Sequence, residues 1–119
     1  MDQNMTTIAQ YFALSDLAPQ DPKAQAQINS FFAPDATVTA ADGTTITGKP
    51  AIAAFFKAFF TRNQQLRHLQ HTTKTATGYQ AQWAVVGQKA GPTLFTLQGH
   101  DDYRFTAAGK ISHLQVTAN

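Results

Sequence analysis

Residues 31–56 read FFAPDATVTAADGTTITGKPAIAAFF, and this stretch decides the fold. Its centre alternates in polarity around Asp42-Gly43, a dipeptide typical of the tight turn of a β-hairpin. On either side of the hairpin, apolar residues recur at the spacing of helical turns instead. The stretch therefore predicts a helix, a hairpin and a second helix in immediate succession.

Three helices are expected in the first half of the chain, each with one apolar face. Those faces comprise Ile8, Tyr11, Phe12 and Ser15, then Ala24, Ile28, Phe31 and Phe32, then Ile52, Phe55, Phe56, Phe59 and Phe60. Asp21 and Pro22 suit the N-cap and the first position of the second helix. Pro34 is expected to end that helix, because proline interrupts helical hydrogen bonding.

The second half changes to the alternating pattern of β-strands. Strands are expected at 66–76, 79–88, 93–105 and 110–118, with glycine- or proline-containing breaks between them. The order of elements indicates an α+β fold: a cone-shaped, curved antiparallel sheet with about three N-terminal helices packed over its concave face. We expect residues 1–119 to form a single domain, with a small-molecule pocket inside the cone.

Composition excludes several functional classes. The net charge is only +2 and the nine basic residues are scattered, which argues against nucleic-acid binding. The chain has no cysteine, so disulfides and thiolate chemistry are excluded. The N-terminus has no signal-peptide pattern and no apolar run reaches membrane-spanning length, so we expect a cytoplasmic protein without membrane contact. Metal-ligand spacings and phosphate-binding loops are missing, so neither a metal nor a cofactor is expected.

Three stretches resemble the nuclear transport factor 2-like superfamily, in its SnoaL-like polyketide-cyclase and ketosteroid-isomerase branches. Residues 31–56 resemble the family's helix, hairpin and helix. Residues 99–111, GHDDYRFTAAGKI, resemble its penultimate strand and turn, and residues 8–17, IAQYFALSDL, its first helix. The resemblance implies the fold described above. The superfamily includes isomerases, cyclases, dehydratases, transport factors and binding modules, so the fold alone does not define an activity.

The ketosteroid-isomerase branch implies particular site residues. By similarity, its first-helix tyrosine falls on Tyr11 and its oxyanion-binding aspartate on Asp101, which would stay protonated and donate to a ligand oxygen. The general-base aspartate of that branch falls on Ala40, so this base is missing here. Asp42 lies in the hairpin turn, where turn chemistry is the expected role.

A histidine is the alternative base. LRHLQH at 66–71 resembles the Arg-His start of the central strand in dehydratase-like members, which implies that His68 faces the pocket and moves protons. Histidine suits this task because its unperturbed pKa lies near neutrality. Strand alternation places His68 and His71 on opposite faces, and neither face is clearly apolar. The residues themselves therefore leave open which histidine points inward.

Asp101 also has two interpretations. If it faces inward beside Tyr103, an apolar environment would raise its pKa, and the neutral carboxyl would donate to a ligand carbonyl or oxyanion. Alternatively, Asp101 accepts hydrogen bonds from neighbouring side chains and only holds the sheet against the first helix. Asp102 would face outward as a partner in a cross-strand ion pair.

The leading hypothesis is a cofactor-independent isomerase, dehydratase or cyclase acting on a small apolar carbonyl or enol compound. Its expected catalytic residues are Tyr11, Asp101 and His68, and its expected pocket lining is Phe12, Val38, Ala40, Phe56, Phe59 and Tyr103. The alternative is a non-catalytic module that binds a hydrophobic ligand or serves dimerisation. In a dimerisation module, Phe55, Phe59 and Trp83 would fill the cone.

The outer sheet face is expected to mediate a homodimer. Polar but uncharged side chains follow this face in the strands predicted at 79–88 and 93–105, namely Gln80, Gln82, Thr96 and Gln98. A surface with so little charge permits self-association, and two-fold pairing is the commonest form of oligomer.

Overall fold

A computed structural model describes residues 2–91 and 93–119. Its helices are α1 (Gln3–Leu17), α2 (Pro22–Ser30) and α3 (Lys49–Thr61), with a short 3₁₀ turn, η1 (Ala18–Gln20), after α1. Its strands are β1 (Phe32–Thr39), β2 (Thr45–Thr47), β3 (Asn63–Lys74), β4 (Tyr79–Lys89), β5 (Leu94–Phe105) and β6 (Ile111–Ala118). No helix in the described ranges is long and apolar enough to cross a membrane.

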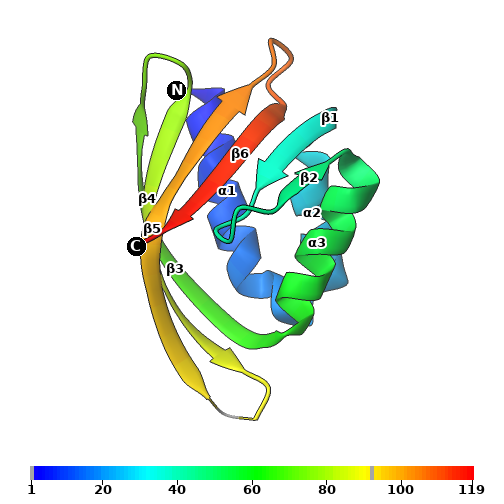
Figure 1. Cartoon of the computed structure of the whole chain (residues 1–119), viewed down its shortest axis with the longest axis vertical. Coiled ribbons are helices and arrows are strands. Elements are labelled where there is room, and N and C mark those ends of the chain that lie inside the picture. Colours follow the sequence, from blue (N-terminus) through cyan, green and yellow to red (C-terminus); the bar gives the residue numbers. More distant parts are fainter. Residues whose placement is uncertain (1, 92) are drawn as a thin grey trace.

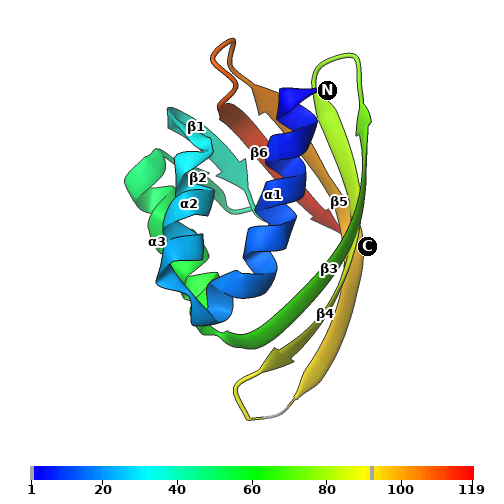
Figure 2. The same cartoon turned by 180° about the vertical axis from the view of Figure 1, so that it is seen from behind.

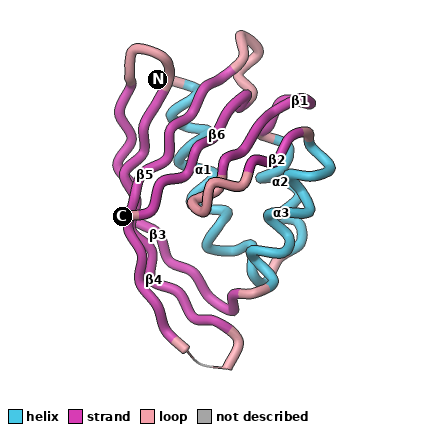
Figure 3. Tube along the Cα trace, viewed as in Figure 1, coloured by secondary structure: helices cyan, strands magenta, loops and turns pink. Residues whose placement is uncertain are grey.

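The six strands form one curved, open sheet in the order β2-β1-β6-β5-β4-β3. All neighbouring strands pair antiparallel except β1 and β6, which pair parallel. The three helices lie on one side of this sheet, as Figures 1 and 2 show from opposite directions. Figure 3 shows the long strands curving past the helical layer. The predicted α+β fold is confirmed, with one parallel strand pair added.

The boundary between α2 and β1 differs from the expectation. Pro34 was expected to end a helix that included Phe32, but α2 ends at Ser30 and Phe32 begins β1. The register between β1 and β6 shifts between Phe32 and Thr37. Pro34 lies inside this irregular step, where a missing N–H removes no regular ladder hydrogen bond. Phe32 is buried in the core as expected, but it belongs to a strand and not to a helix.

The predicted helix start and hairpin turn are confirmed. Pro22 is the first residue of α2, and the Asp21 side chain accepts a hydrogen bond from the backbone N–H of Lys23. In the hairpin, Gly43 has a φ of 89°, a conformation that favours glycine. Asp42 accepts from the backbone N–H of Thr44 at 2.9 Å, so this carboxylate has the turn role expected of it.

The core lies between the helices and the inner sheet face. The largest fully buried side chains are Ile8, Ile28, Phe32, Val38, Ile52, Phe60, Leu66, Tyr103, Ile111 and Leu114. Burial of each such side chain stabilises the fold by roughly 1.5–3 kcal/mol. Helix α1 supplies part of this core, and it is also held across the sheet by Asp16, which bonds to β3, and by its N-cap Asp2, which bonds to β4.

Candidate functional site

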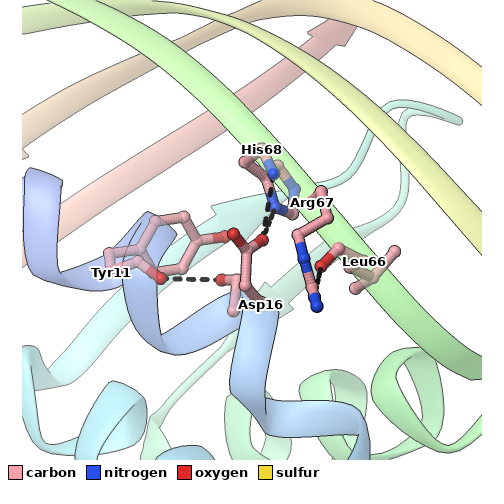
Figure 4. Close-up of polar contacts among 6 residues, drawn as sticks. Tyr11, Asp16, Leu66, Arg67 and His68 are labelled. Atoms are coloured by element: carbon pink, nitrogen blue, oxygen red, sulfur yellow. Dashed lines mark hydrogen bonds and ion pairs between the residues drawn. The ribbon is translucent and has the colours of Figure 1, made fainter.

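The two ends of α1 are tied to the sheet by carboxylates. Asp2 caps the helix and accepts a hydrogen bond from the Tyr79 hydroxyl of β4 at 2.7 Å. Near the other end, Asp16 meets His68 of β3 (Figure 4). These two contacts fix the rotation of α1, which sets the direction of the remaining α1 side chains on its inner face.

Asp16 and His68 form a closely bonded pair. Asp16 Oδ1 lies 2.7 Å from His68 Nδ1 and accepts a second hydrogen bond from the His68 backbone N–H at 3.0 Å. Because a carboxylate accepts at Nδ1, the ring carries its hydrogen there, and Nε2 of the neutral ring is left as a proton acceptor. The side chains are 11% exposed for His68 and 23% for Asp16, so the pair is accessible without being fully solvated.

The structure places His68 on the helix-facing side of β3. Its ring lies 5.5 Å from the ring of Phe12, measured between centroids. Leu66, on the same side of β3, is fully buried. His71 is exposed on the opposite side, so of the two histidines it is His68 that meets α1.

Asp101 is buried on the same inner face, with 3% of its surface exposed. Trp83 Nε1 donates to its Oδ1 at 2.9 Å, and the Tyr103 hydroxyl donates to its Oδ2 at 2.8 Å. Burial raises the pKa of Asp101 to about 7, although both of these hydrogen bonds act to lower it. The carboxyl is therefore neutral in mildly acidic solution and ionised in alkaline solution.

Tyr11 projects from α1 into the same interior. It is 8% exposed, and its ring packs edge-on against Tyr103 with 6.2 Å between centroids. Burial and the nearby negative charge of Asp101 raise the pKa of Tyr11 well above its ordinary value, so its hydroxyl stays protonated. Within the described residues this hydroxyl makes no side-chain hydrogen bond. Tyr11 and Asp101 are therefore neighbours, although they do not hydrogen-bond to each other.

The two polar clusters lie on one sheet face with Trp83 between them. Gln70, Trp83 and Gly99 form one cross-strand row. His68 belongs to the next same-face row on one side, and Asp101 to the next row on the other side. With ideal strand spacings, their Cα atoms are about 14 Å apart along the strands and about 10 Å across them. His68 and Asp101 thus share a face without direct contact.

The predicted pocket-lining residues pack closely. Val38, Phe12, Phe56 and Tyr103 are buried in the core, and Ala40 and Phe59 are half-buried. Two cavities, of about 810 Å³ and about 360 Å³, occur where mostly outward-facing side chains gather. His68 contributes to the larger cavity and Tyr103 to the smaller, but neither cavity is lined by Tyr11 or Asp101.

Sequence reasoning missed Asp16, and it considered Trp83 only as a side chain that could fill the cone. Asp16 is one helical turn after Phe12, which placed it on the inward side of α1, but its partner is 52 residues away. Trp83 has the inward parity of β4, yet its bond to Asp101 depends on strand register. Neither contact has a local sequence signal of its own.

Asp102 lies on the outer sheet face, as its parity implied. Its cross-strand partner is an uncharged side chain, because Gln80 Nε2 donates to Asp102 Oδ1 at 3.1 Å. Within β5, His100 Nε2 lies 3.6 Å from Asp102 Oδ2, and this contact is an ion pair only when His100 is protonated. In residues 2–91 and 93–119, no three potential metal-ligating side chains gather into a cluster.

The sequence from residue 8 to residue 114 matches the model of the SnoaL-like domain. The chain belongs to this family. The predicted membership of the nuclear transport factor 2-like superfamily is thereby confirmed. A search among curated proteins found no match.

Solved structures agree with this assignment. A nuclear transport factor 2-like protein of unknown function from Exiguobacterium sp. 255-15 is 32% identical, with a TM-score of 0.86 over 95% of this chain and 98% of that one. A Mycobacterium tuberculosis protein in complex with estradiol-17beta-hemisuccinate is 18% identical, with a TM-score of 0.82 over 100% and 95%. A computationally designed 17-OHP binder is 18% identical, with a TM-score of 0.83 over the same shares.

Proposed function

We propose that this SnoaL-like domain binds a small apolar carbonyl or enol compound between α1 and the inner sheet face and transfers a proton on it with His68. The Asp16–His68 pair carries this proposal. Asp16 Oδ1 accepts one hydrogen bond from the ring Nδ1 of His68 and one from the His68 backbone N–H, which fixes both the orientation and the tautomer of the ring. On a substrate with a proton next to a carbonyl, such a base can catalyse isomerisation, dehydration or cyclisation without a cofactor.

The ligand oxygen would be held near Tyr11 and Asp101. Tyr11 offers a hydroxyl that stays protonated and makes no side-chain hydrogen bond among the described residues. Donors in a buried apolar environment stabilise a developing enolate more than donors in water do. Ala40 stands where ketosteroid isomerases have their base, so the proposed base is His68 and steroid isomerisation itself is not proposed.

The fold is compatible with apolar ligands. The Mycobacterium protein was solved with a steroid derivative, and the designed protein binds 17-OHP. Both are too distant in sequence to pass on their ligands, so they support only the choice of an apolar compound as probe.

A non-catalytic module is the second candidate, and two observations favour it. Both oxygens of Asp101 already accept hydrogen bonds from the protein, which suits a structural anchor. Phe55, Phe59 and Trp83 also pack against the core instead of standing free. In this case the interior would be a folding core, or a site that binds a ligand without reacting with it.

We also propose that the outer sheet face forms a two-fold homodimer. This face has an outer apolar patch, which we define as Leu69, Ala84, Val86 and Leu94. Three of its members are large and exposed: Leu69 by 79%, Leu94 by 69% and Val86 by 47%. Exposed apolar side chains clustered on neighbouring strands are typical of interaction surfaces. A second copy fits because the patch can pair with itself across a two-fold axis.

Deuterium exchange tests the proton-transfer proposal. The probe is 2-tetralone, a neutral bicyclic ketone, dissolved in D₂O with the protein, and loss of its α-proton signals is followed by NMR. We expect exchange above the buffer rate, reduced at least tenfold by His68→Gln and also reduced by Asp16→Asn. His71→Gln is the matched control and should exchange like the wild type. Equal rates for wild type and His68→Gln would reject His68 as the base.

A further inference from the structure

Trp83, Asp101 and Tyr103 form a continuous hydrogen-bonded chain across β4 and β5. The indole reaches Asp101 by lying over Gly99. A Cβ at Gly99 would stand 2.9 Å from Trp83 Cζ2 and 2.0 Å from the backbone oxygen of Thr117. Glycine at this position therefore leaves room for the indole ring. In this position the indole N–H donates to Oδ1 of Asp101.

The chain has a direction, because its members differ in what they can donate. An indole N–H only donates, so Asp101 Oδ1 always acts as an acceptor. When Asp101 is neutral, its hydrogen must then reside on Oδ2, which is 2.8 Å from the Tyr103 hydroxyl oxygen. The Tyr103 oxygen then accepts the carboxyl hydrogen. The hydroxyl hydrogen of Tyr103 stays on its oxygen but no longer bonds to Asp101, so it is free to bond to another acceptor. When Asp101 is ionised, both of its oxygens accept, and the Tyr103 hydroxyl turns back to donate to Oδ2.

We infer that Trp83 is a positioning residue that confines the acid hydrogen of Asp101 to Oδ2, so that Tyr103 presents the hydrogen that selects a neutral carbonyl ligand. This inference rests on the proposed function, because it names the donor and the ligand class of the same interior. It differs from the expectation based on resemblance, in which Asp101 itself donates to the ligand.

The surroundings of Tyr103 explain why its free hydroxyl hydrogen would favour a ligand that offers a hydrogen-bond acceptor. Tyr103 is 1% exposed, so water does not readily satisfy its hydroxyl. Its aromatic neighbours include Tyr11 and Phe105, whose ring centroids lie 6.2 Å and 6.4 Å away. An unsatisfied buried donor costs free energy, and a bound carbonyl oxygen would remove that cost. A hydrocarbon of the same shape would leave it in place.

Among the ionisable groups in contact with Asp101 on the inner face, we expect only Asp101 itself to titrate near neutrality. Tyr11 of α1 and Tyr103 of β5 have raised pKa values and stay protonated. Asp102 follows on β5 and faces outward, where it raises the pKa of Asp101. The paired positions on the flanking strands, Ala81 of β4 and Val116 of β6, do not titrate. Affinity for a ketone should then be constant in mild acid and fall about tenfold per pH unit above 7.

The first experiment needs no ligand. Trp83 is the single tryptophan, so its indole N–H gives one assignable NMR signal. We expect that signal to titrate with a midpoint near 7 in the wild type and to stay constant in Asp101→Asn. In Tyr103→Phe the midpoint should rise, because the ionised carboxylate loses a donor. An indole signal that ignores pH in the wild type would overturn the inferred chain.

The second experiment measures binding of 2-tetralone, with tetralin as the matched hydrocarbon without oxygen. In the wild type, affinity for the ketone should fall at high pH, and saturating ketone should raise the indole midpoint. Asp101→Asn should bind independently of pH, because its amide accepts from Trp83 and donates permanently to Tyr103. Trp83→Phe should move the affinity profile to higher pH, because the carboxylate loses a donor. It should also weaken ketone binding in mild acid, because the acid hydrogen can then reside on Oδ1 while Tyr103 donates to Oδ2, and a merely structural role would not produce this second change.

Tyr103→Phe separates this inference from the proposed function. We expect it to bind 2-tetralone weakly at every pH, while Tyr11→Phe keeps the pH dependence. Wild-type affinity and pH profile in Tyr103→Phe would overturn the inference and leave the proposed function standing. If 2-tetralone binds no better than tetralin at any pH, the proposed function fails, and the assignment of Tyr103 as a ligand donor fails with it.

Discussion

At the scale of single residues, Asp101 is a carboxyl whose burial costs free energy. A carboxyl that is 3% exposed loses its hydration, and two hydrogen bonds replace only part of it. The neutral form avoids most of this cost, which is why burial raises the pKa to about 7. In the unfolded chain, the same group ionises near 3.8.

This difference predicts a pH dependence of stability. Between about pH 4 and pH 7 the unfolded chain ionises at Asp101 while the folded protein stays neutral there, so the free energy of unfolding falls as pH rises. The slope is about 1.4 kcal/mol per pH unit, and it vanishes above 7. Urea unfolding followed by Trp83 fluorescence measures it, with Asp101→Asn as the control. An equal slope in both proteins would assign the effect to other groups.

At the scale of elements, the inner sheet face depends on glycines that leave room for large side chains. Gly87 and Gly99 both lie on this face, in β4 and β5. A Cβ at Gly87 would meet side-chain atoms, the closest being the ring of Phe95 at 2.4 Å. A Cβ at Gly99 would meet the backbone oxygen of Thr117 at 2.0 Å. A side chain can rotate away, but the backbone of β6 cannot move without disturbing its pairing with β5.

We therefore expect Gly99→Ala to be more destabilising than Gly87→Ala. Overpacking typically costs about 1–3 kcal/mol, and Gly99→Ala should lie at the upper end or beyond. It should also displace the indole of Trp83 and change its fluorescence, whereas Gly87→Ala should not. Chemical denaturation of the two variants provides the comparison. Similar losses would show that β6 yields as easily as the Phe95 ring.

The elements also show how far one sequence predicts the molecule. Helix periodicity, the Asp21 cap and the Asp42-Gly43 turn act locally, and each appears in the structure as expected. The predicted end of α2 was wrong, because the pairing of β1 with β6 competes with continuation of the helix at Phe32. The Asp16–His68 bond was not predicted at all, since it depends on how α1 lies across β3.

At the scale of the whole molecule, the two sides of the sheet have different proposed roles. The inner face holds the polar clusters under the helices, and the outer face carries the outer apolar patch. A stable interface buries about 800 Å² per partner, which an open six-stranded sheet can supply. Dimerisation would cover the patch without touching Tyr11 or Asp101.

Charge introduced into the patch should dissociate the proposed dimer. We expect Leu69→Lys to elute as a monomer in size-exclusion chromatography with light scattering, because dimerisation would bury a lysine charge in an apolar interface. Leu17→Lys is the matched control, since Leu17 is 56% exposed but belongs to α1. A wild type that is monomeric at high concentration, or a Leu69→Lys variant that remains dimeric, would refute the outer-face dimer.

The most direct test of the central claim maps where an apolar ketone binds. ¹⁵N–¹H spectra recorded with 2-tetralone, and separately with tetralin, would compare the inner and outer sheet faces in one experiment. We predict saturable shifts at Tyr11, His68 and the Trp83 indole with the ketone, and much weaker ones with the hydrocarbon. Shifts confined to the outer apolar patch, or equal responses to both compounds, would contradict an inner site that recognises a carbonyl oxygen.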